Sequence, residues 1–189
     1  WVCKNIFNEF PVSKFSMAYS KGDSITKNAL KHRNSNYILH TDIINFFNNI
    51  TREKISSLFS NNPDIVEKLD LSEQDIIDIL NIVLYRGERL VIGSVASPLI
   101  SNCIMYTFDN KLYEMLDKDS NMKYTRYSDD IVISSDKYID DNMIDIIDEL
   151  LKEEGFSRNI EKTYFMNRSS RRLVTGIVLD NNTNKLSIG

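Results

Sequence analysis

The sequence is poor in cysteine and in histidine, with two of each among 189 residues. Cys3 lies close to the first residue and Cys103 falls in an apolar helical pattern, so we expect a buried thiol at Cys103 rather than a disulfide bond. Neither cysteine has the neighbouring ligands of a zinc site, and His32 and His40 lack metal-ligand spacing. We therefore interpret His40 as an ordinary strand residue.

A long hydrophobic run is also missing. No uninterrupted apolar stretch approaches the roughly 20 residues that cross a membrane, and the first residues lack the basic and then apolar pattern of a signal peptide. We therefore expect a cytoplasmic protein without a membrane partner. The 189 residues, 42% of them hydrophobic, suffice for one domain with a buried core, or for one domain and a fragment. Because Trp1 is no natural start, we expect a fragment or a trimmed chain.

Excess positive charge is lacking as well. The net charge of −4 argues against a generic nucleic-acid binder, whose affinity depends largely on Lys and Arg at phosphates. The charges are unevenly distributed: residues 1–60 carry 8 basic and 4 acidic side chains, residues 61–154 carry 9 and 21, and residues 155–189 carry 6 and 2. This pattern is consistent with basic surfaces flanking an acidic body, and equally with an ordinary acidic protein.

The most informative stretch is Tyr-Ser-Asp-Asp at 127–130. Aromatic and β-branched residues, which favour strands, flank it on both sides, whereas Ser-Asp-Asp favours a turn. The pattern predicts a β-hairpin with Asp129 and Asp130 at its tip. A solvated turn gains nothing from a second adjacent acid, whereas a magnesium site gains an oxygen ligand from each carboxylate.

A third acid, Asp42, ends an apolar run at 37–42 that predicts a strand. Residues 45–59 follow with the apolar spacing of a helix. Two adjacent large rings cannot both face one core from a helix. We therefore assign Phe46 to the core and expect another role for Phe47.

Together these stretches resemble the motifs of a reverse transcriptase palm. The run at 42–47 is similar to motif A, Gly-Ser-Val-Ala-Ser-Pro-Leu-Ile-Ser-Asn at 93–102 to motif B, the hairpin at 127–130 to motif C and Asn-Ile-Glu-Lys-Thr at 159–163 to motif D. Val-Thr-Gly-Ile-Val at 174–178 is similar to the segment after motif D in bacterial retron reverse transcriptases.

The resemblance implies an α+β fold, in which a polymerase palm with an antiparallel β-sheet backed by helices is joined to part of the fingers. Residues 1–36 would be a partial fingers segment and residues 37–189 the palm, and the thumb would be absent.

The resemblance also implies a two-metal site. Asp42, Asp129 and Asp130 would hold two Mg²⁺ ions, for which Mn²⁺ could substitute, with the backbone carbonyl of Ile43 as an extra ligand. Since adjacent strand residues leave opposite faces, we expect Asp42 and Asp129 to bridge the ions and Asp130 to support them less directly. Lys162 would lie near the triphosphate and donate a proton to the departing pyrophosphate; an ordinary solvated lysine is the alternative.

Further positions would contact substrate. Phe47 matches the family position whose ring lies under the incoming sugar and excludes a 2′-hydroxyl. Tyr127 would pack beside the primer end, with a cross-strand aromatic contact as the alternative. Lys21 could contact template or primer phosphate, or be an ordinary turn lysine.

The motif B stretch keeps Gly93, Ser97 and Asn102 but departs from the family elsewhere. A glycine there permits close approach of the backbone to a nucleotide or template base, which needs no side chain. The family's glutamine, first proline and threonine are replaced by Ile92, Val95 and Ala96. These replacements put substrate fidelity or template handling in doubt more than activity.

Other elements are expected from periodicity and turn residues. The sequence predicts helices at 24–30, 72–84, 99–115 and 139–151, a short strand at 90–92, a hairpin around 174–176 and a polar turn at 181–184. Near the 174–176 hairpin we expect phosphate contacts from three arginines: Arg168, Arg171 and Arg172.

The function predicted from the resemblance is that of a retron-type RNA-templated DNA polymerase, which transfers nucleotides from dNTPs to a primer 3′- or 2′-hydroxyl. Its partners would be template and primer RNA and DNA, a retron non-coding RNA and an effector protein, and its role defence against phage. Two alternatives remain. One is another palm-type nucleotidyltransferase, such as an RNA-templated RNA polymerase or a cyclic-dinucleotide synthase. The other is a non-catalytic or regulatory palm that binds RNA or a partner.

Overall fold

The computed structural model describes residues 1–19, 22–116, 121–180 and 186–188. The chain divides into two compact units, each made of two separate stretches. The helical unit combines Trp1–Ser13 with Asn45–Thr107, and the sheet unit combines Lys14–Ile44 with Phe108–Gly189. The predicted fingers segment 1–36 and palm 37–189 are divisions of a different kind and stay predictions.

The helical unit consists of short helices in its described residues. They are α1 (Val2–Asn5), η1 (Phe7–Glu9), η2 (Phe47–Asn49), α3 (Arg52–Ser60), α4 (Pro63–Lys68), α5 (Glu73–Val83), α6 (Ser97–Ile104) and the first residues of α7 (Tyr106–Glu114). Phe7, Phe10 and Phe59 form an aromatic core, in which the Phe10 and Phe59 rings meet edge to face at 5.2 Å. Cys103 is buried beside them, as predicted, and burial raises the pKa of its thiol to about 12.

Helix α5 matches the helix predicted at 72–84. Ser72 caps it, because its hydroxyl accepts a hydrogen bond from the Asp75 N–H while the Asp75 carboxylate accepts one from the Ser72 N–H. The sequence pattern placed Ile76, Ile77, Leu80 and Val83 on the buried side, which is partly wrong: Leu80 and Val83 are buried together with Ile79, whereas Ile77 is 42% exposed.

Three predictions for the helical unit are wrong in detail. No single helix spans 45–59, because the backbone is extended at Ile50. The Ile50 carbonyl accepts a hydrogen bond from the Leu90 N–H, so the chain pairs with residues 89–90 instead of continuing the turn of η2. The 90–92 strand is replaced by isolated bridges at Arg89. The helix expected at 99–115 is two helices, α6 and α7, because the backbone leaves helical geometry at the buried Met105.

The sheet unit contains two antiparallel sheets. The larger has the order β2-β3-β1-β4 and the smaller the order β5-β6-β7. Their strands are β1 (Tyr37–Asp42), β2 (Lys123–Tyr127), β3 (Asp130–Ser135), β4 (Tyr164–Asn167), β5 (Arg172–Val174), β6 (Ile177–Leu179) and β7 (Leu186–Ile188). The predicted turn at 181–184 lies outside the described residues.

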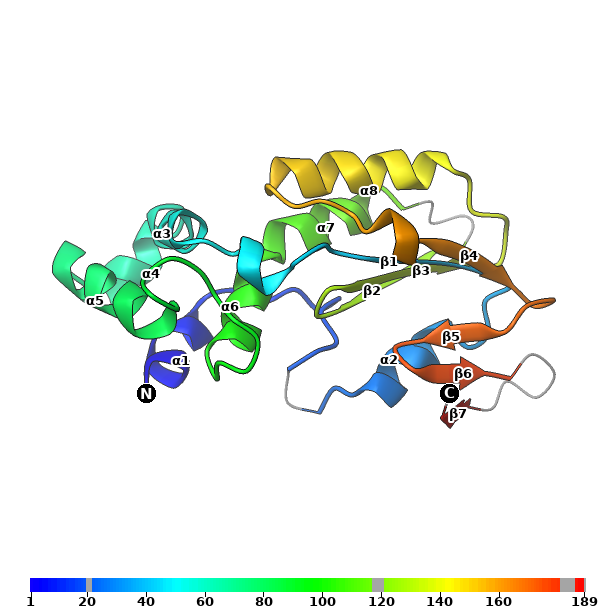
Figure 1. Ribbon diagram of the computed structural model, residues 1–189, viewed down its shortest axis with the longest axis horizontal. Coiled ribbons are helices and arrows are strands. Elements are labelled where there is room, and N and C mark those ends of the chain that lie inside the picture. Colours follow the sequence, from blue (N-terminus) through cyan, green and yellow to red (C-terminus); the bar gives the residue numbers. More distant parts are fainter. Residues whose placement is uncertain (20–21, 117–120, 181–185, 189) are drawn as a thin grey trace. The chain divides into compact units, whose positions relative to one another are not determined.

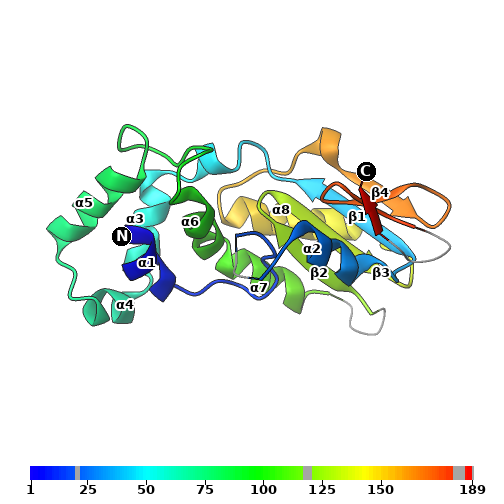
Figure 2. The same cartoon turned by 90° about the horizontal axis from the view of Figure 1, so that it is seen from below.

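Helices cover both faces of the larger sheet. Helices α7 and α8 (Asn142–Glu153) lie along one face, while α2 (Ile25–His32) and the smaller sheet lie against the other (Figure 1). Seen from below, α2 lies across the sheet on the side opposite α8 (Figure 2). Ser24 caps helix α2, because its hydroxyl accepts a hydrogen bond from the Lys27 N–H, and Gly155, with φ +68°, follows the end of α8.

The strand register sets which side chains share a face. In β1 and β3, Ile38 is opposite Ser134, His40 opposite Val132 and Asp42 opposite Asp130. Directly opposed residues of antiparallel strands point to the same side. This face is apolar in its middle, where Ile38 and Val132 join residues of α2, β4 and the smaller sheet in one core, and acidic at the end of β1. No described helix is both long and apolar enough to span a bilayer.

Candidate active site

The predicted hairpin is formed by β2 and β3, with Ser128 and Asp129 as its turn. Ser128 adopts the left-handed backbone, with φ +60°, which lets two residues reverse the chain. The Ile43 N–H donates to the Asp129 carbonyl at 3.1 Å, and Asp42 is directly opposite Asp130. The end of β1 and the hairpin turn thus bring the three predicted acids to one end of the two central strands, β1 and β3.

Asp42 is held by Lys162, which lies in the short helix η4 (Ile160–Lys162). The Lys162 Nζ donates to the Asp42 Oδ2 at 3.0 Å. This hydrogen bond and the Asp42 charge raise the pKa of the lysine, so its ammonium is well populated at neutral pH. Asp42 is 5% exposed whereas the Lys162 side chain is largely solvated, so a solvent-exposed ammonium reaches a nearly buried carboxylate.

His40 belongs to the same cluster, which the sequence did not predict. Its Nε2 lies 3.2 Å from the Asp130 Oδ1, its Nδ1 lies 3.2 Å from the Lys162 carbonyl, and its ring stacks on Tyr164 at 4.6 Å. A carbonyl only accepts, so a hydrogen bond between Nδ1 and the Lys162 carbonyl needs the proton on Nδ1. The period of two in β1 was a usable signal, because His40 shares the face of Asp42.

Asp129 carries the electrostatic signature of the site. Burial raises the pKa of its carboxyl, and the charges of Asp42 and Asp130 raise it further. Three carboxylates at the ends of β1 and β3 are hard oxygen donors, and their combined negative charge exceeds the single positive charge of the Lys162 ammonium bonded to Asp42, so the donor set fits a divalent cation such as Mg²⁺. Among the described residues, no three Asp, Glu, His or Cys side chains already stand in a metal-holding arrangement, and the Asp42 and Asp130 carboxylates face Lys162 and His40.

Tyr127 is half-buried on the hairpin, in the position opposite Asp130. Its ring centroid lies 6.4 Å from that of Tyr19, whose hydroxyl donates to the Ser128 hydroxyl at 3.2 Å. The aromatic pair therefore flanks the turn. The predicted position beside a primer end stays a prediction, as does phosphate binding by Lys21, which lies outside the described residues.

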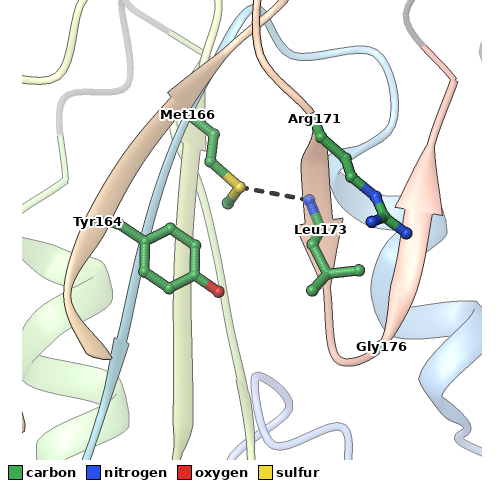
Figure 3. Close-up of a pocket in the computed structure, with 5 residues that line it drawn as sticks. All are labelled: Tyr164, Met166, Arg171, Leu173 and Gly176. Atoms are coloured by element: carbon green, nitrogen blue, oxygen red, sulfur yellow. Dashed lines mark hydrogen bonds between the residues drawn. The ribbon is translucent and has the colours of Figure 1, made fainter. Parts of the chain in front are cut away.

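A pocket of about 500 Å³ adjoins this cluster. Tyr164 and Met166 line it from β4, and Arg171, Leu173 and Gly176 line it from the β5–β6 hairpin (Figure 3). The Leu173 N–H points at the Met166 sulfur at 3.3 Å and joins the two walls. Because Tyr164 also stacks on His40, the pocket shares a wall with the acidic cluster.

The three arginines near this hairpin differ in how far their guanidinium groups are free to contact a phosphate. Arg171 is exposed at the pocket, consistent with a phosphate contact. Arg172 is fully buried and donates to the carbonyls of Ser35 and Asp180, so its predicted phosphate contact is wrong. Through the Ser35 carbonyl, Arg172 connects the β5–β6 hairpin to the loop before β1. Arg168 donates to Asn36 and to the Asn34 carbonyl in the same loop.

The remaining predicted substrate residues lie in the helical unit. Phe46 is buried and Phe47 half-buried, which confirms the predicted core role of Phe46. Gly93 has φ +90°, a backbone that favours glycine, and nothing lies within 4 Å of a Cβ added to it. Ser97 and Asn102 are buried in α6, and the Ser97 hydroxyl donates to the Val91 carbonyl at 2.8 Å, which closes the loop that carries Gly93.

Two of the three residues that depart from the family's motif B are highly exposed. Ile92 is 84% exposed and Val95 is 89% exposed, whereas Ala96 is buried. The loop therefore presents a glycine and two apolar side chains to solvent.

Comparison with known proteins gives concordant matches. A family model described as "Reverse transcriptase (RNA-dependent DNA polymerase)" matches residues 2–179. Retron Ec73 reverse transcriptase of Escherichia coli is 30% identical over 186 residues, covering 94% of this chain and 59% of its own length. Retron Ec86 reverse transcriptase of the same species is 29% identical over 192 residues, covering 100% and 56%.

Among solved structures, apo telomerase from Candida tropicalis superposes with a TM-score of 0.64 at 13% identity, covering 99% of this chain and 38% of that one. Telomerase from Candida albicans, in complex with a fragment of telomeric RNA, has a TM-score of 0.62 at 13% identity, covering 93% and 35%. At such identity these likenesses show a shared fold. The chain spans a little over half the length of the retron enzymes that it matches.

Proposed function

The chain belongs to the reverse transcriptase (RNA-dependent DNA polymerase) family, and we propose that it carries the catalytic part of a retron-type RNA-templated DNA polymerase. It would extend a primer 3′- or 2′-hydroxyl with dNTPs against an RNA template. The observation that carries this proposal is the meeting of three acids from two distant stretches, with Asp42 opposite Asp130 and Ile43 bonded to Asp129.

We propose that Asp42, Asp129, Asp130 and the Ile43 carbonyl hold the metal. Two Mg²⁺ ions, or Mn²⁺ in their place, would activate the primer hydroxyl and neutralise the triphosphate when bound. The raised pKa of Asp129 supports this assignment, because a cation at the cluster would relieve the repulsion that raises it.

Lys162 is the proposed proton donor to the departing pyrophosphate. Its raised pKa keeps it protonated, and its exposed, flexible stem lets the ammonium leave Asp42 for a phosphate oxygen. Phe47 is the proposed sugar gate, and Tyr127 the proposed neighbour of the primer end. Gly93 would lie against a nucleotide or template base, with Ser97 and Asn102 supporting its loop, and Lys21 would contact phosphate.

We further propose a retron non-coding RNA as template and an effector protein as partner, with a role in defence against phage. The similarity to retron reverse transcriptases supports this assignment. A non-catalytic palm is the second candidate, favoured by the occupation of Asp42 by Lys162 and of Asp130 by His40.

Mg²⁺-dependent extension of a primed RNA, compared between dNTPs and NTPs, separates these candidates. Asp129→Asn should lower extension on the order of 100-fold or more, because a charged ligand is lost, while the melting temperature stays equal or rises as carboxylate repulsion falls. Asp136→Asn is the matched control, since it removes an exposed acid beyond the other end of β3 and should leave extension unchanged. Full extension by Asp129→Asn would contradict the metal role, and absence of extension by the unaltered chain would favour the non-catalytic palm.

A further inference from the structure

Beneath the hairpin turn lies a fully buried ion pair that has no part in the proposed metal binding or proton transfer. The Arg126 guanidinium donates from Nε and Nη2 to the two carboxylate oxygens of Asp109, each at 2.8 Å. Its remaining nitrogen, Nη1, donates to the Ser128 carbonyl at 2.9 Å. Both charged side chains are 0% exposed. One rigid planar group therefore joins helix α7 to the first residue of the turn.

The arginine itself is fixed on several sides. Its backbone N–H donates to the Phe15 carbonyl at 2.9 Å, and its carbonyl accepts from the Met17 N–H at 2.7 Å. Asp109 is fixed as well, because it also accepts a hydrogen bond from the Tyr124 hydroxyl. The guanidinium thus has little freedom to move away from the turn.

The turn needs such support. Ser128 holds a left-handed backbone without being glycine, a conformation that persists only where the surroundings impose it. The next residue is Asp129, whose carboxylate direction depends on the backbone of Ser128. A shift of this carbonyl therefore moves the acid that we assign to the metal.

Stability alone does not explain the choice of arginine. A buried ion pair is generally no better for stability than well-packed apolar side chains of similar volume. A lysine would neutralise Asp109 as well, but as a single point charge it cannot bond both carboxylate oxygens and a carbonyl in one plane. The observed contacts need all three nitrogens of the planar guanidinium.

We propose that Arg126 is a positioning residue, which Asp109 orients and which holds the Ser128 carbonyl so that the Asp129 carboxylate lies in reach of Asp42 and Asp130. This inference rests on the proposed function, because positioning matters only if the three acids act together. The turn geometry itself can be measured without activity.

The test compares Arg126→Lys with Tyr124→Phe in the full chain. Tyr124→Phe is the matched control, since it removes a donor to the same carboxylate but touches no turn atom. Three quantities are measured: amide hydrogen exchange in peptides spanning 127–131, Mn²⁺ affinity by electron paramagnetic resonance, and kcat and KM for dNTP incorporation. For Arg126→Lys we expect faster exchange in the turn and about 10- to 100-fold losses in Mn²⁺ affinity and kcat with an unchanged KM. Tyr124→Phe should give far smaller changes, because Arg126 keeps its hydrogen bonds to both Asp109 oxygens and to the Ser128 carbonyl.

If Arg126→Lys does not fold, the triple variant Asp109→Leu, Tyr124→Phe, Arg126→Met replaces the network with apolar side chains of similar size and is measured in the same way. A lowered melting temperature with unchanged turn exchange and Mn²⁺ affinity in a folded variant would overturn the proposal. If the unaltered chain binds no Mn²⁺ and extends no primer, the proposed function fails. The exchange data then still decide whether Arg126 holds the turn.

Discussion

His32 is fully buried between two hydroxyl groups of the larger sheet. Its Nδ1 lies 2.7 Å from the Ser134 Oγ and its Nε2 lies 2.7 Å from the Thr125 Oγ1. Burial lowers the pKa of the imidazole to about 3, with further lowering from the charges of Lys123 and Lys31. The ring is therefore neutral in the folded protein above about pH 3. In the unfolded chain the same imidazole, with its ordinary pKa of about 6.5, is protonated below pH 6.5.

This shift predicts acid sensitivity. The pKa of His32 is lower in the folded protein than its value of about 6.5 in the unfolded chain. The stabilisation of the folded protein by the neutral imidazole is therefore fully present above pH 6.5 and is lost as the pH falls toward 3. Between pH 7 and pH 5 we expect His32 to lower the free energy of unfolding by about 2 kcal/mol. Urea unfolding at both pH values should show this loss in the natural chain and not in His32→Gln, which is less stable at pH 7. An equal loss in both proteins would contradict the assignment.

Phe47 carries the prediction about sugar selection. The sequence predicted that one of two adjacent rings would be core and the other free for another role, and Phe46 is 3% exposed while Phe47 is only half-buried. Phe47→Ala should lower the preference for dNTP over NTP by about tenfold or more, since an excluding ring would be gone. Phe165→Ala, which removes a part-exposed ring on β4, should leave the preference unchanged. Unchanged selectivity in Phe47→Ala would remove Phe47 from the site.

At the level of elements, local chemistry decided what the sequence could predict. The hairpin was predictable because strand-forming and turn-forming residues alternate sharply around 127–130, and α5 because Ser72 and Asp75 form a capping box. The break between α6 and α7 at Met105 could not be predicted, since no glycine or proline marks it in the sequence. His40 was missed because its partners, Asp130 of β3 and the Lys162 carbonyl of η4, are distant from it in the sequence.

The glycine loop before α6 carries a prediction at this scale. Gly93→Ala should destabilise the chain by about 1–2 kcal/mol, because φ +90° is strained for alanine while the added Cβ meets no atom. If a nucleotide approaches this backbone, the KM for dNTP should also rise, because the Cβ fills the space it needs.

Gly87→Ala is the control for this experiment. Gly87 has φ +73°, and an added Cβ would meet the Arg52 guanidinium at an ordinary 3.5 Å, so the stability loss should be similar. Its KM should not change. Equal KM values for the two variants, measured by steady-state extension, would remove Gly93 from the nucleotide site.

At the scale of the whole molecule, the proposed site residues are distributed over both units. The chain passes between the units after Ser13, Ile44 and Thr107. The proposed metal ligands lie in the sheet unit, whereas the proposed sugar gate Phe47 and the Gly93 loop lie in the helical unit. If Phe47 and Gly93 have their proposed roles, polymerase activity would need residues of both units, whereas the proposed metal binding would need only the acids of the sheet unit.

This division predicts that damage to one core can be localised. Phe59 is 2% exposed and packs edge to face on Phe7 and Phe10 in the helical unit. Phe59→Ala should cost about 3–5 kcal/mol, because it leaves a cavity among aromatic rings. We expect amide exchange to rise in α3 and η1 while β1 and β3 stay protected, with Mn²⁺ affinity kept and extension lost. Equal loss of protection in both units would show instead that they unfold together, as one cooperative structure.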